Sequence, residues 1–170
     1  MREPDVPLLS LPEPLAVRAV EAADQDFLDE LYFHSRQDLH QAVPDPATLR
    51  QFIVMQQRIQ EAGSREHYPQ ATQWILLSRG ERAGRLVVDA SGSDLRVVDI
   101  AIAPAARRGG VARAVLQALQ ARAHAGGLTV SLAVARTNAA ARALYQGLGF
   151  TVRSDDGVME QRVWRSAASE

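Results

Sequence analysis

The sequence predicts a single α/β domain with a mixed sheet, in the order β-α-α-β-β-β-α-β-α-β-β. Three observations support this order. Two segments with a helical period follow a short first strand. Three β-rich runs joined by short turns come next, and helices then alternate with strands. The 170 residues are enough for one domain with its own core. We predict an irregular lead-in over residues 1–14 and one domain over residues 15–166.

The first strand and the first two helices are predicted from local signals. Residues 15–20 alternate as in a strand, and Asp24 is placed to cap a helix with apolar residues at a 3.6-residue period. Asp45 and Pro46 mark a second helix start, with Asp as the cap and Pro at the first helical position. A polar connection is expected over residues 63–70. The second helix is expected to present on one face Leu49, Phe52, Ile53 and Ile59, with Gln56 among them.

The second half of the chain opens with three β-rich runs, separated by turn signals at residues 79–82 and 91–94. Connections this short predict an antiparallel meander. The three runs cover residues 74–77, 84–89 and 95–102. The later elements are predicted as helices over residues 110–125 and 138–148 and strands over residues 128–134, 150–152 and 158–164.

Composition excludes several classes of protein. A net charge of −1 argues against nucleic acid as the main partner. No apolar run approaches the roughly 20 residues that span a bilayer, and the proline-rich, acidic start is unlike a signal peptide. The absence of cysteine excludes disulfides, thiolate catalysis and cysteine-based zinc sites. A cytoplasmic enzyme without a metal is therefore expected. No metal-ligand spacing is found among His34, His40, His67 and His124.

The most informative segment is the strand that ends at Pro104, followed by a glycine turn and a helix. This arrangement points several backbone N–H groups into one concavity at a helix N-terminus, which suits a pyrophosphate. Gly109 and Gly110 let the backbone approach phosphates closely. An ordinary turn explains these glycines equally well. The segment contains neither a P-loop nor a Rossmann glycine motif. Positive charge around the turn comes from Arg107, Arg108 and Arg113.

Two motifs here resemble those of the GNAT superfamily of acyl-CoA-dependent acetyltransferases. The family signature Gln/Arg-x-x-Gly-x-Gly/Ala is matched by Arg107, Gly110 and Ala112, and the preceding strand with its trailing Pro104 is similar to the family's fourth strand. The resemblance covers about residues 15–164. A second signature is matched downstream by Asn138, Ala141, Leu144, Tyr145, Leu148, Gly149 and Phe150.

The resemblance implies direct transfer of the acetyl group of acetyl-CoA to an amine, on a small molecule or a protein N-terminus, in a ternary complex. It implies that the fourth and fifth strands splay apart and that an N–H near Ile102 stabilises the oxyanion. A homodimer is an open alternative, as is a non-catalytic acyl-CoA-binding or interaction module on the same fold. The implied cofactor contacts are Ile100, Ala101, Ile102, Arg107, Arg108, Gly109, Gly110, Val111, Ala112, Arg113 and, on the pantetheine, Asn138.

Tyr145 and Asp99 are the candidate catalytic residues. The Tyr145 phenol can protonate the leaving sulfur, although its helical spacing from Ala141, Leu144 and Leu148 also fits a core stripe. Asp99 is the only carboxylate within the apolar run of its strand, where burial without a role is costly. It is a candidate base, through water, or a partner for the positive charge of the amine. A structural pairing with an arginine explains it equally well.

Residues near the expected acceptor site are predicted more weakly. The resemblance places this site around the end of the first helix. The candidates, which an ordinary polar surface explains about as well, are His34, Ser35, Arg36, Gln56, His67 and Tyr68.

Overall fold

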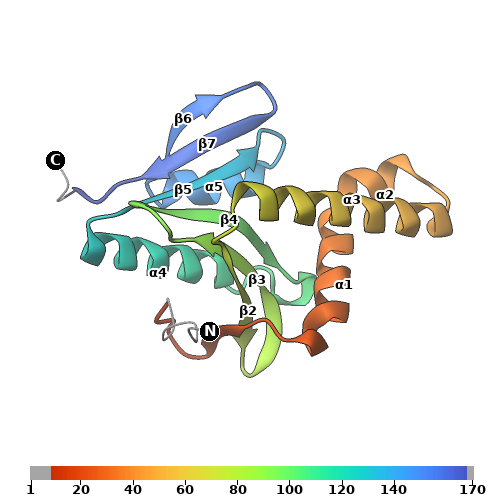
Figure 1. The fold of residues 1–170 in the computed structure, drawn as a ribbon, viewed down its shortest axis with the longest axis horizontal. Helices are drawn as coiled ribbons and strands as arrows, with labels where there is room; N and C mark the ends of the chain where they lie inside the picture. Colours follow the sequence, from red (N-terminus) through yellow and green to blue (C-terminus); the bar gives the residue numbers. More distant parts are fainter. Residues whose placement is uncertain (1–8, 168–170) are drawn as a thin grey trace.

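A mixed sheet with helices on both faces forms the centre of the computed structural model, which describes residues 9–167 (Figure 1). Its strand order is β1-β2-β3-β4-β5-β7-β6. All neighbouring strands are antiparallel except β4 and β5, which are parallel, so the predicted meander and mixed sheet are confirmed. The strands are β1 Leu15–Ala19, β2 Thr72–Ser78, β3 Glu81–Asp89, β4 Asp94–Ile102, β5 Thr129–Ala135, β6 Thr151–Asp155 and β7 Met159–Trp164.

The helices follow the predicted order, with one short addition between the first two. The helices are α1 Gln25–Ser35, α2 Gln37–Ala42, α3 Pro46–His67, α4 Val111–Gly126 and α5 Ala139–Gly147. The addition is α2, whose six residues carry little periodic signal. The predicted connection over residues 63–70 is wrong in its first part, because α3 continues through Gly63 to His67. A glycine inside a helix costs only about 1 kcal/mol, and the Tyr68 N–H still donates to the Ser64 carbonyl oxygen at 2.8 Å.

The lead-in predicted over residues 1–14 lies partly outside the described residues. From Leu9 to Pro14 the chain forms no helix or strand, and Leu9 is buried in the core. The domain limits themselves stay a prediction. Within residues 9–167 no helix is long and apolar enough to cross a membrane.

Side chains along each strand point alternately to the two faces of the sheet, and these two faces are different environments. In β3, Leu86 and Val88 join the main core together with residues of α4 and α5. Arg85 and Val87 alternate with them and therefore point to the other face, which α1 and α3 cover. The core on the α4 side includes Leu95, Val97, Val115, Leu116, Leu119, Val130 and Leu132.

A β-bulge at Val98 changes the alternation within β4. Val87 pairs with Asp99 and Val88 with Val97, so Val98 has no partner of its own in β3. Just before the bulge, β4 pairs with β5 over Asp94–Val97, and among the described residues no pairing between the two strands follows. β5 instead continues alone beside β7 to Ala135. The predicted splay of the fourth and fifth strands is thus confirmed, and it begins at the bulge.

Asp24 occupies the position before α1, but it does not cap that helix as predicted. Its fully buried carboxylate accepts two hydrogen bonds from Arg18 at 2.8 Å, one from Arg82 at 2.7 Å and one from the Glu21 N–H at 2.8 Å. These partners, Arg18 first, hold the pKa of Asp24 well below its usual range. A buried carboxylate needs such charged partners, and here they join β1 and β3 to the start of α1.

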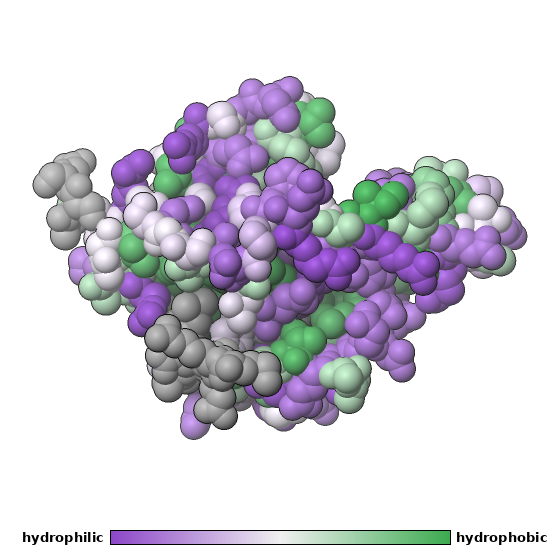
Figure 2. Space-filling view, in the orientation of Figure 1, coloured by the Kyte–Doolittle hydropathy of each residue, from purple (hydrophilic) through white to green (hydrophobic). Residues whose placement is uncertain are grey.

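The start of α3 is predicted correctly, and its apolar face is predicted in part, because Leu49 and Ile53 are buried as expected whereas Phe52 and Ile59 are not. The Asp45 side chain accepts from the Thr48 N–H at 3.0 Å, as expected for the cap. Phe52 and Ile59 are 37% and 60% exposed, and the buried glutamine is Gln57 rather than Gln56. The outer half of α3 extends with α2 beyond the sheet (Figure 1), and hydrophobic surface lies over this arm (Figure 2). The face of α3 that is buried carries Leu49, Ile53 and Gln57.

Candidate active site

The splay between β4 and β5 leaves a cleft of about 160 Å³. Its walls come from β4, from β5 and from the start and the last turn of α5. The residues that line it are Val97–Ile100, Leu132–Ala135, Asn138 and Tyr145.

The cleft side of β4 presents unpaired backbone groups. The Ala103 N–H donates to the Ala83 carbonyl oxygen at 2.8 Å, so Ala103 faces β3. Because successive residues of a strand point their polar groups to opposite edges, the backbone N–H groups of Ile102 and Ile100 point away from β3, and Ile100 also lines the cleft. The Ile102 carbonyl oxygen accepts a bond from Arg107 Nε at 3.2 Å on that side. Ala101 pairs with Arg85 in β3, so of the three predicted backbone contacts only Ile100 and Ile102 offer N–H groups to a ligand.

The glycine turn opens α4 without a side-chain cap. Gly110 stands at the N-cap with a φ of 74°, and Arg108 before it also has a positive φ, of 66°. The Ala114 N–H makes the first helical bond, to the Gly110 carbonyl oxygen at 3.0 Å. Three backbone N–H groups, those of Val111, Ala112 and Arg113, therefore lack helical acceptors. These groups and the helix dipole form a site for an anion.

The charged side chains around this turn are exposed and available. Arg107, Arg108 and Arg113 all lie at the surface, and within the described part of the chain none of them forms an ion pair. Val111 is different, because its side chain is 5% exposed and belongs to the core. Only its backbone can contact a ligand.

Tyr145 lines the cleft from α5 and is also part of the core. Its side chain is buried, with its ring 5.9 Å from that of Phe150. Asn138 fixes the start of α5, since its side-chain oxygen accepts from the Ala141 N–H at 3.1 Å, which leaves the Asn138 amide nitrogen as the donor toward the cleft. Burial, and then the negative charge of Asp99, raise the pKa of Tyr145. The phenol is therefore protonated at neutral pH.

Asp99 lies directly after the bulge and borders two cavities. Its carboxylate is 3.7 Å from Arg85 Nε, an ion pair without a hydrogen bond, and about a third of the side chain is exposed. Burial raises the pKa of Asp99, while the charge of Arg85 and the Ile100 N–H act in the opposite direction. The arginine partner considered from the sequence is thus present, at a distance that leaves both groups free to bind something else.

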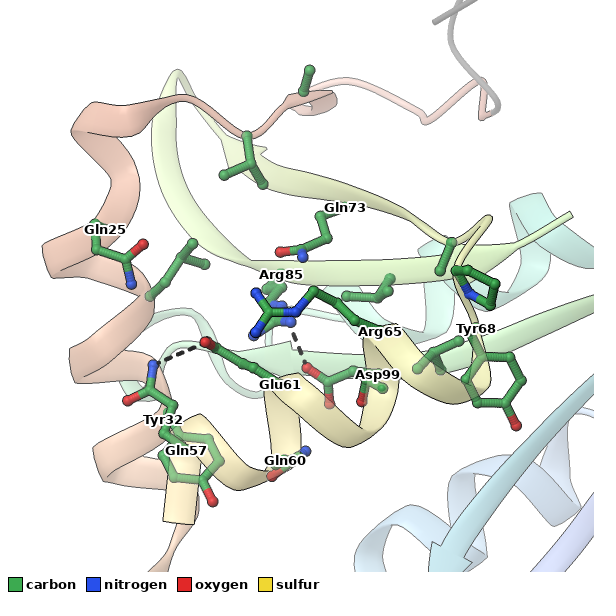
Figure 3. Close-up of a pocket in the computed structure, with 18 residues that line it drawn as sticks. Gln25, Tyr32, Gln57, Gln60, Glu61, Arg65, Tyr68, Gln73, Arg85 and Asp99 are labelled. Carbon is green, nitrogen blue, oxygen red and sulfur yellow. Dashed lines mark hydrogen bonds and ion pairs between the residues drawn. The ribbon is translucent and has the colours of Figure 1, made fainter. Parts of the chain in front are cut away.

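The second cavity, of about 630 Å³, lies on the other face of the sheet, between α1, α3 and strands β2 to β4 (Figure 3). It shares Val98 and Asp99 with the cleft. Of the acceptor candidates, only Tyr68 lines it. Gln57 and Gln60 replace Gln56, because the face of α3 is rotated from the predicted one. His34, Ser35, Arg36 and His67 do not line it, and His67 donates to the Gly63 carbonyl oxygen at 2.8 Å.

The comparison with family models matches residues 24–150 to one described as the acetyltransferase (GNAT) family. The chain belongs to the GNAT acetyltransferase family. The GNAT chain is accordingly an N-acetyltransferase that uses acetyl-CoA as its co-substrate. The cleft and the open turn of α4 fit that molecule, because one offers strand backbone to an extended arm and the other offers N–H groups to phosphates.

Solved structures similar to this GNAT chain share its fold at low sequence identity. The PaiA N-acetyltransferase of Thermoplasma acidophilum, in complex with coenzyme A, is 15% identical over 89% of this chain and 99% of its own, with a TM-score of 0.65. The spermidine N-acetyltransferase of Vibrio cholerae, with CoA and spermine, is 16% identical over 91% and 96%, with a TM-score of 0.62. The ribosomal-protein-S18-alanine N-acetyltransferase of Escherichia coli is 22% identical over 88% and 90%, at 0.55. A search of curated proteins finds no match.

Sequence reasoning found the cleft of the GNAT chain but missed most of the second cavity. Gln57, Glu61, Arg65 and Arg85 carry no motif, and only the tertiary fold, which places α3 and β3 around one cavity, brings them together. A signal for the bulge was present. The core-facing apolar residues of β4 change from odd to even positions, with Leu95 and Val97 before Val98 and Ile100 and Ile102 after it. Across residues 9–167, no group of histidine, aspartate and glutamate is arranged to hold a metal.

Proposed function

We propose that acetyl-CoA binds along the β4–β5 cleft, with its pyrophosphate at the start of α4, and that the acceptor amine enters from the cavity between α1 and α3. The observation that carries this assignment is the wall shared by the two cavities, formed by Val98 and Asp99. An amine in one cavity and a thioester in the other would meet there, next to Tyr145.

The chemistry needs a neutral amine and a proton for the departing sulfur. Acetyl-CoA supplies a thioester, whose C–S bond breaks as the C–N bond to the amine forms. Asp99 accepts the proton of the incoming ammonium, directly or through one water. The Tyr145 phenol, kept protonated by its surroundings, donates its proton to the sulfur, and the second proton that the nitrogen loses on forming the amide restores the phenol. The N–H groups of Ile100 and Ile102 point away from β3, on the edge of β4 where the cleft lies, and can donate to the carbonyl oxygen.

The direct test combines binding with turnover. The purified protein is titrated with acetyl-CoA by calorimetry, and a panel of amines is then added while free CoA is measured. Binding together with amine-dependent CoA release supports the assignment. A variant with Arg108 and Arg113 neutralised should bind acetyl-CoA more weakly. Unchanged affinity in that variant would contradict the placement of the pyrophosphate at α4.

Asp99→Asn is expected to lower kcat/KM by about 100-fold or more, since a positioned base contributes at least that factor.

The Asp99→Asn substitution should also stabilise the fold at neutral pH. The pKa of Asp99 is raised in the folded state, so the folded protein holds that proton more tightly than the unfolded chain. Stability therefore falls as pH rises through the interval between the ordinary and the raised pKa, and the ionised group is a net cost above it. Thermal melts at several pH values and initial rates measure both effects. Full activity in Asp99→Asn would remove the base from the mechanism.

Gly110→Ala is expected to weaken acetyl-CoA binding by about tenfold or more. The positive φ of Gly110 positions the first N–H groups of α4, and an L-residue in that region costs about 1–2 kcal/mol. Gly157→Ala is the matched control, because Gly157 also has a positive φ, of 92°, and open space around its Cβ position, but lies in the β6–β7 turn. Both variants should lose stability, and only Gly110→Ala should lose affinity in calorimetry. Equal affinities for the two variants would show that the turn does not bind the cofactor.

A further inference from the structure

The charges in the larger cavity identify a class of acceptor, an inference that rests on the proposed function. Two cations and two anions line it: Arg65 and Arg85, Glu61 and Asp99. They come from α3 and from strands β3 and β4, and Figure 3 shows the guanidinium groups of Arg65 and Arg85 directed toward the same space, with Asp99 beside them. A cavity with balanced charge suits a ligand that carries both signs better than a multiply charged amine.

Arg85 has hydrogen-bonding capacity that the protein does not use. Its side chain is only 13% exposed, and its ion pair with Asp99 spans 3.7 Å. The buried Nε–H of Arg85 has no hydrogen-bond partner. A buried donor in this state carries a desolvation cost that a bound acceptor would remove. An anionic group that reaches Arg85 would therefore gain a charge-assisted bond where the free protein has none.

Arg65 adds a second unused cation at the rim of the same cavity. It is exposed, and within residues 9–167 it forms no hydrogen bond or ion pair. Glu61, one turn before it on α3, already accepts a bond from Gln57 Nε2 at 3.4 Å. The two arginines thus offer donors to a single anion, and a carboxylate can accept from both.

We propose that the acceptor is a zwitterion of the α-amino-acid type, whose carboxylate binds Arg85 and Arg65 while its amine lies at Asp99. The neighbouring Arg85 and Asp99 side chains match the adjacent carboxylate and ammonium of such a molecule. The same Asp99 then takes the ammonium proton, and the freed amine bonds to the acetyl carbon as the C–S bond breaks. The remaining volume, bordered by Leu28, Tyr32 and Tyr68, accommodates the side chain of the acceptor.

The experiment uses matched acceptors that differ only in the carboxylate. Each of the common α-amino acids is compared with its carboxamide and its decarboxylated amine, and spermidine is added as a polycation; CoA release gives kcat/KM for each. At least one amino acid should exceed its carboxamide and its amine by tenfold or more, as expected when charge-assisted hydrogen bonds are lost.

Variants locate the recognition. Arg85→Gln and Arg65→Gln should each raise KM for the amino acid by about tenfold with a smaller change in kcat, and each should lower kcat/KM for the carboxamide by at least threefold less than for the amino acid. Arg65 is exposed, so its variant stays informative if Arg85→Gln does not fold. Arg58→Gln, on the exposed side of α3 and outside the cavity, is the matched control and should behave as the unsubstituted protein.

Three outcomes would overturn the proposal, and the first two separate it from the proposed function. If amines or carboxamides are acetylated as well as the amino acids, in a reaction that needs Asp99 and Tyr145, the zwitterion is wrong while the assignment of the two cavities stands. If no compound releases CoA and acetyl-CoA does not bind, both fail. A loss in Arg85→Gln that is equal for amino acid and carboxamide would also refute recognition of the carboxylate.

Discussion

Replacing Tyr145 with Phe should reduce kcat by about 100-fold or more while acetyl-CoA affinity stays within a few-fold of its original value. The substitution removes only the hydroxyl, so the ring keeps its packing against Phe150 and the proton donor to the sulfur is lost. Steady-state kinetics and calorimetric titration measure the two quantities.

Two further measurements distinguish this catalytic role of Tyr145 from a purely structural one. The melting temperature should change little, because a buried hydroxyl in a cleft contributes little to the core. In a plot of kcat against pH, the loss of activity at high pH should occur above the usual pKa range of a tyrosine. The reason is that burial and Asp99 raise the pKa of Tyr145. Unchanged turnover in Tyr145→Phe would mean that Tyr145 is a core residue only.

A second large effect is expected at Gly84, a position that no motif marks. A Cβ there would lie 2.3 Å from the Ala101 carbonyl oxygen, which belongs to the backbone of β4 and cannot rotate away. Gly84→Ala should lower the free energy of unfolding by about 1–3 kcal/mol, the usual cost of overpacking. The strain falls on β4 next to Ile102, so acetyl-CoA affinity should fall as well.

The same substitution at Gly63 is the control, and its effect on the free energy of unfolding should have the opposite sign. Gly63 lies inside α3 with open space around its Cβ position, so Gly63→Ala should stabilise the fold by about 0.5–1 kcal/mol. Denaturant unfolding of the two variants gives the comparison. If Gly84→Ala is as stable as Gly63→Ala, β3 and β4 are not in the close contact described here.

Local signals in the sequence were enough for most elements of this fold. Alternation, caps and glycine turns predicted the strands, the start of α3 and the ends of α4 and α5, because each depends on residues close together in the chain. The apolar face of α3 was predicted only in part, with Leu49 and Ile53 buried as expected, and the rest differs for a tertiary reason. The outer half of that helix projects beyond the sheet, so the apolar side chain of Phe52 stays exposed, and nothing near it in the sequence indicates this.

The cofactor half and the acceptor half of the candidate site also differ in how far the local sequence predicts them. The residues assigned to the cofactor lie in two continuous segments around Gly110 and Tyr145, and motifs of fixed spacing can mark them. The acceptor cavity joins α3 to β3 and β4, so Arg65, Arg85 and Asp99 are placed together only by packing. Of these three residues only Asp99 was recognised beforehand, because a carboxylate within an apolar strand is conspicuous in any context.

The shared wall at Val98 and Asp99 has a consequence for the order of events. The two cavities lie toward opposite faces of the sheet and meet only at this point. With acetyl-CoA and the acceptor placed as we propose, neither substrate has to pass through the other's route. We therefore expect no obligatory order of binding, and we expect that the acetylated product can leave while CoA still occupies the cleft.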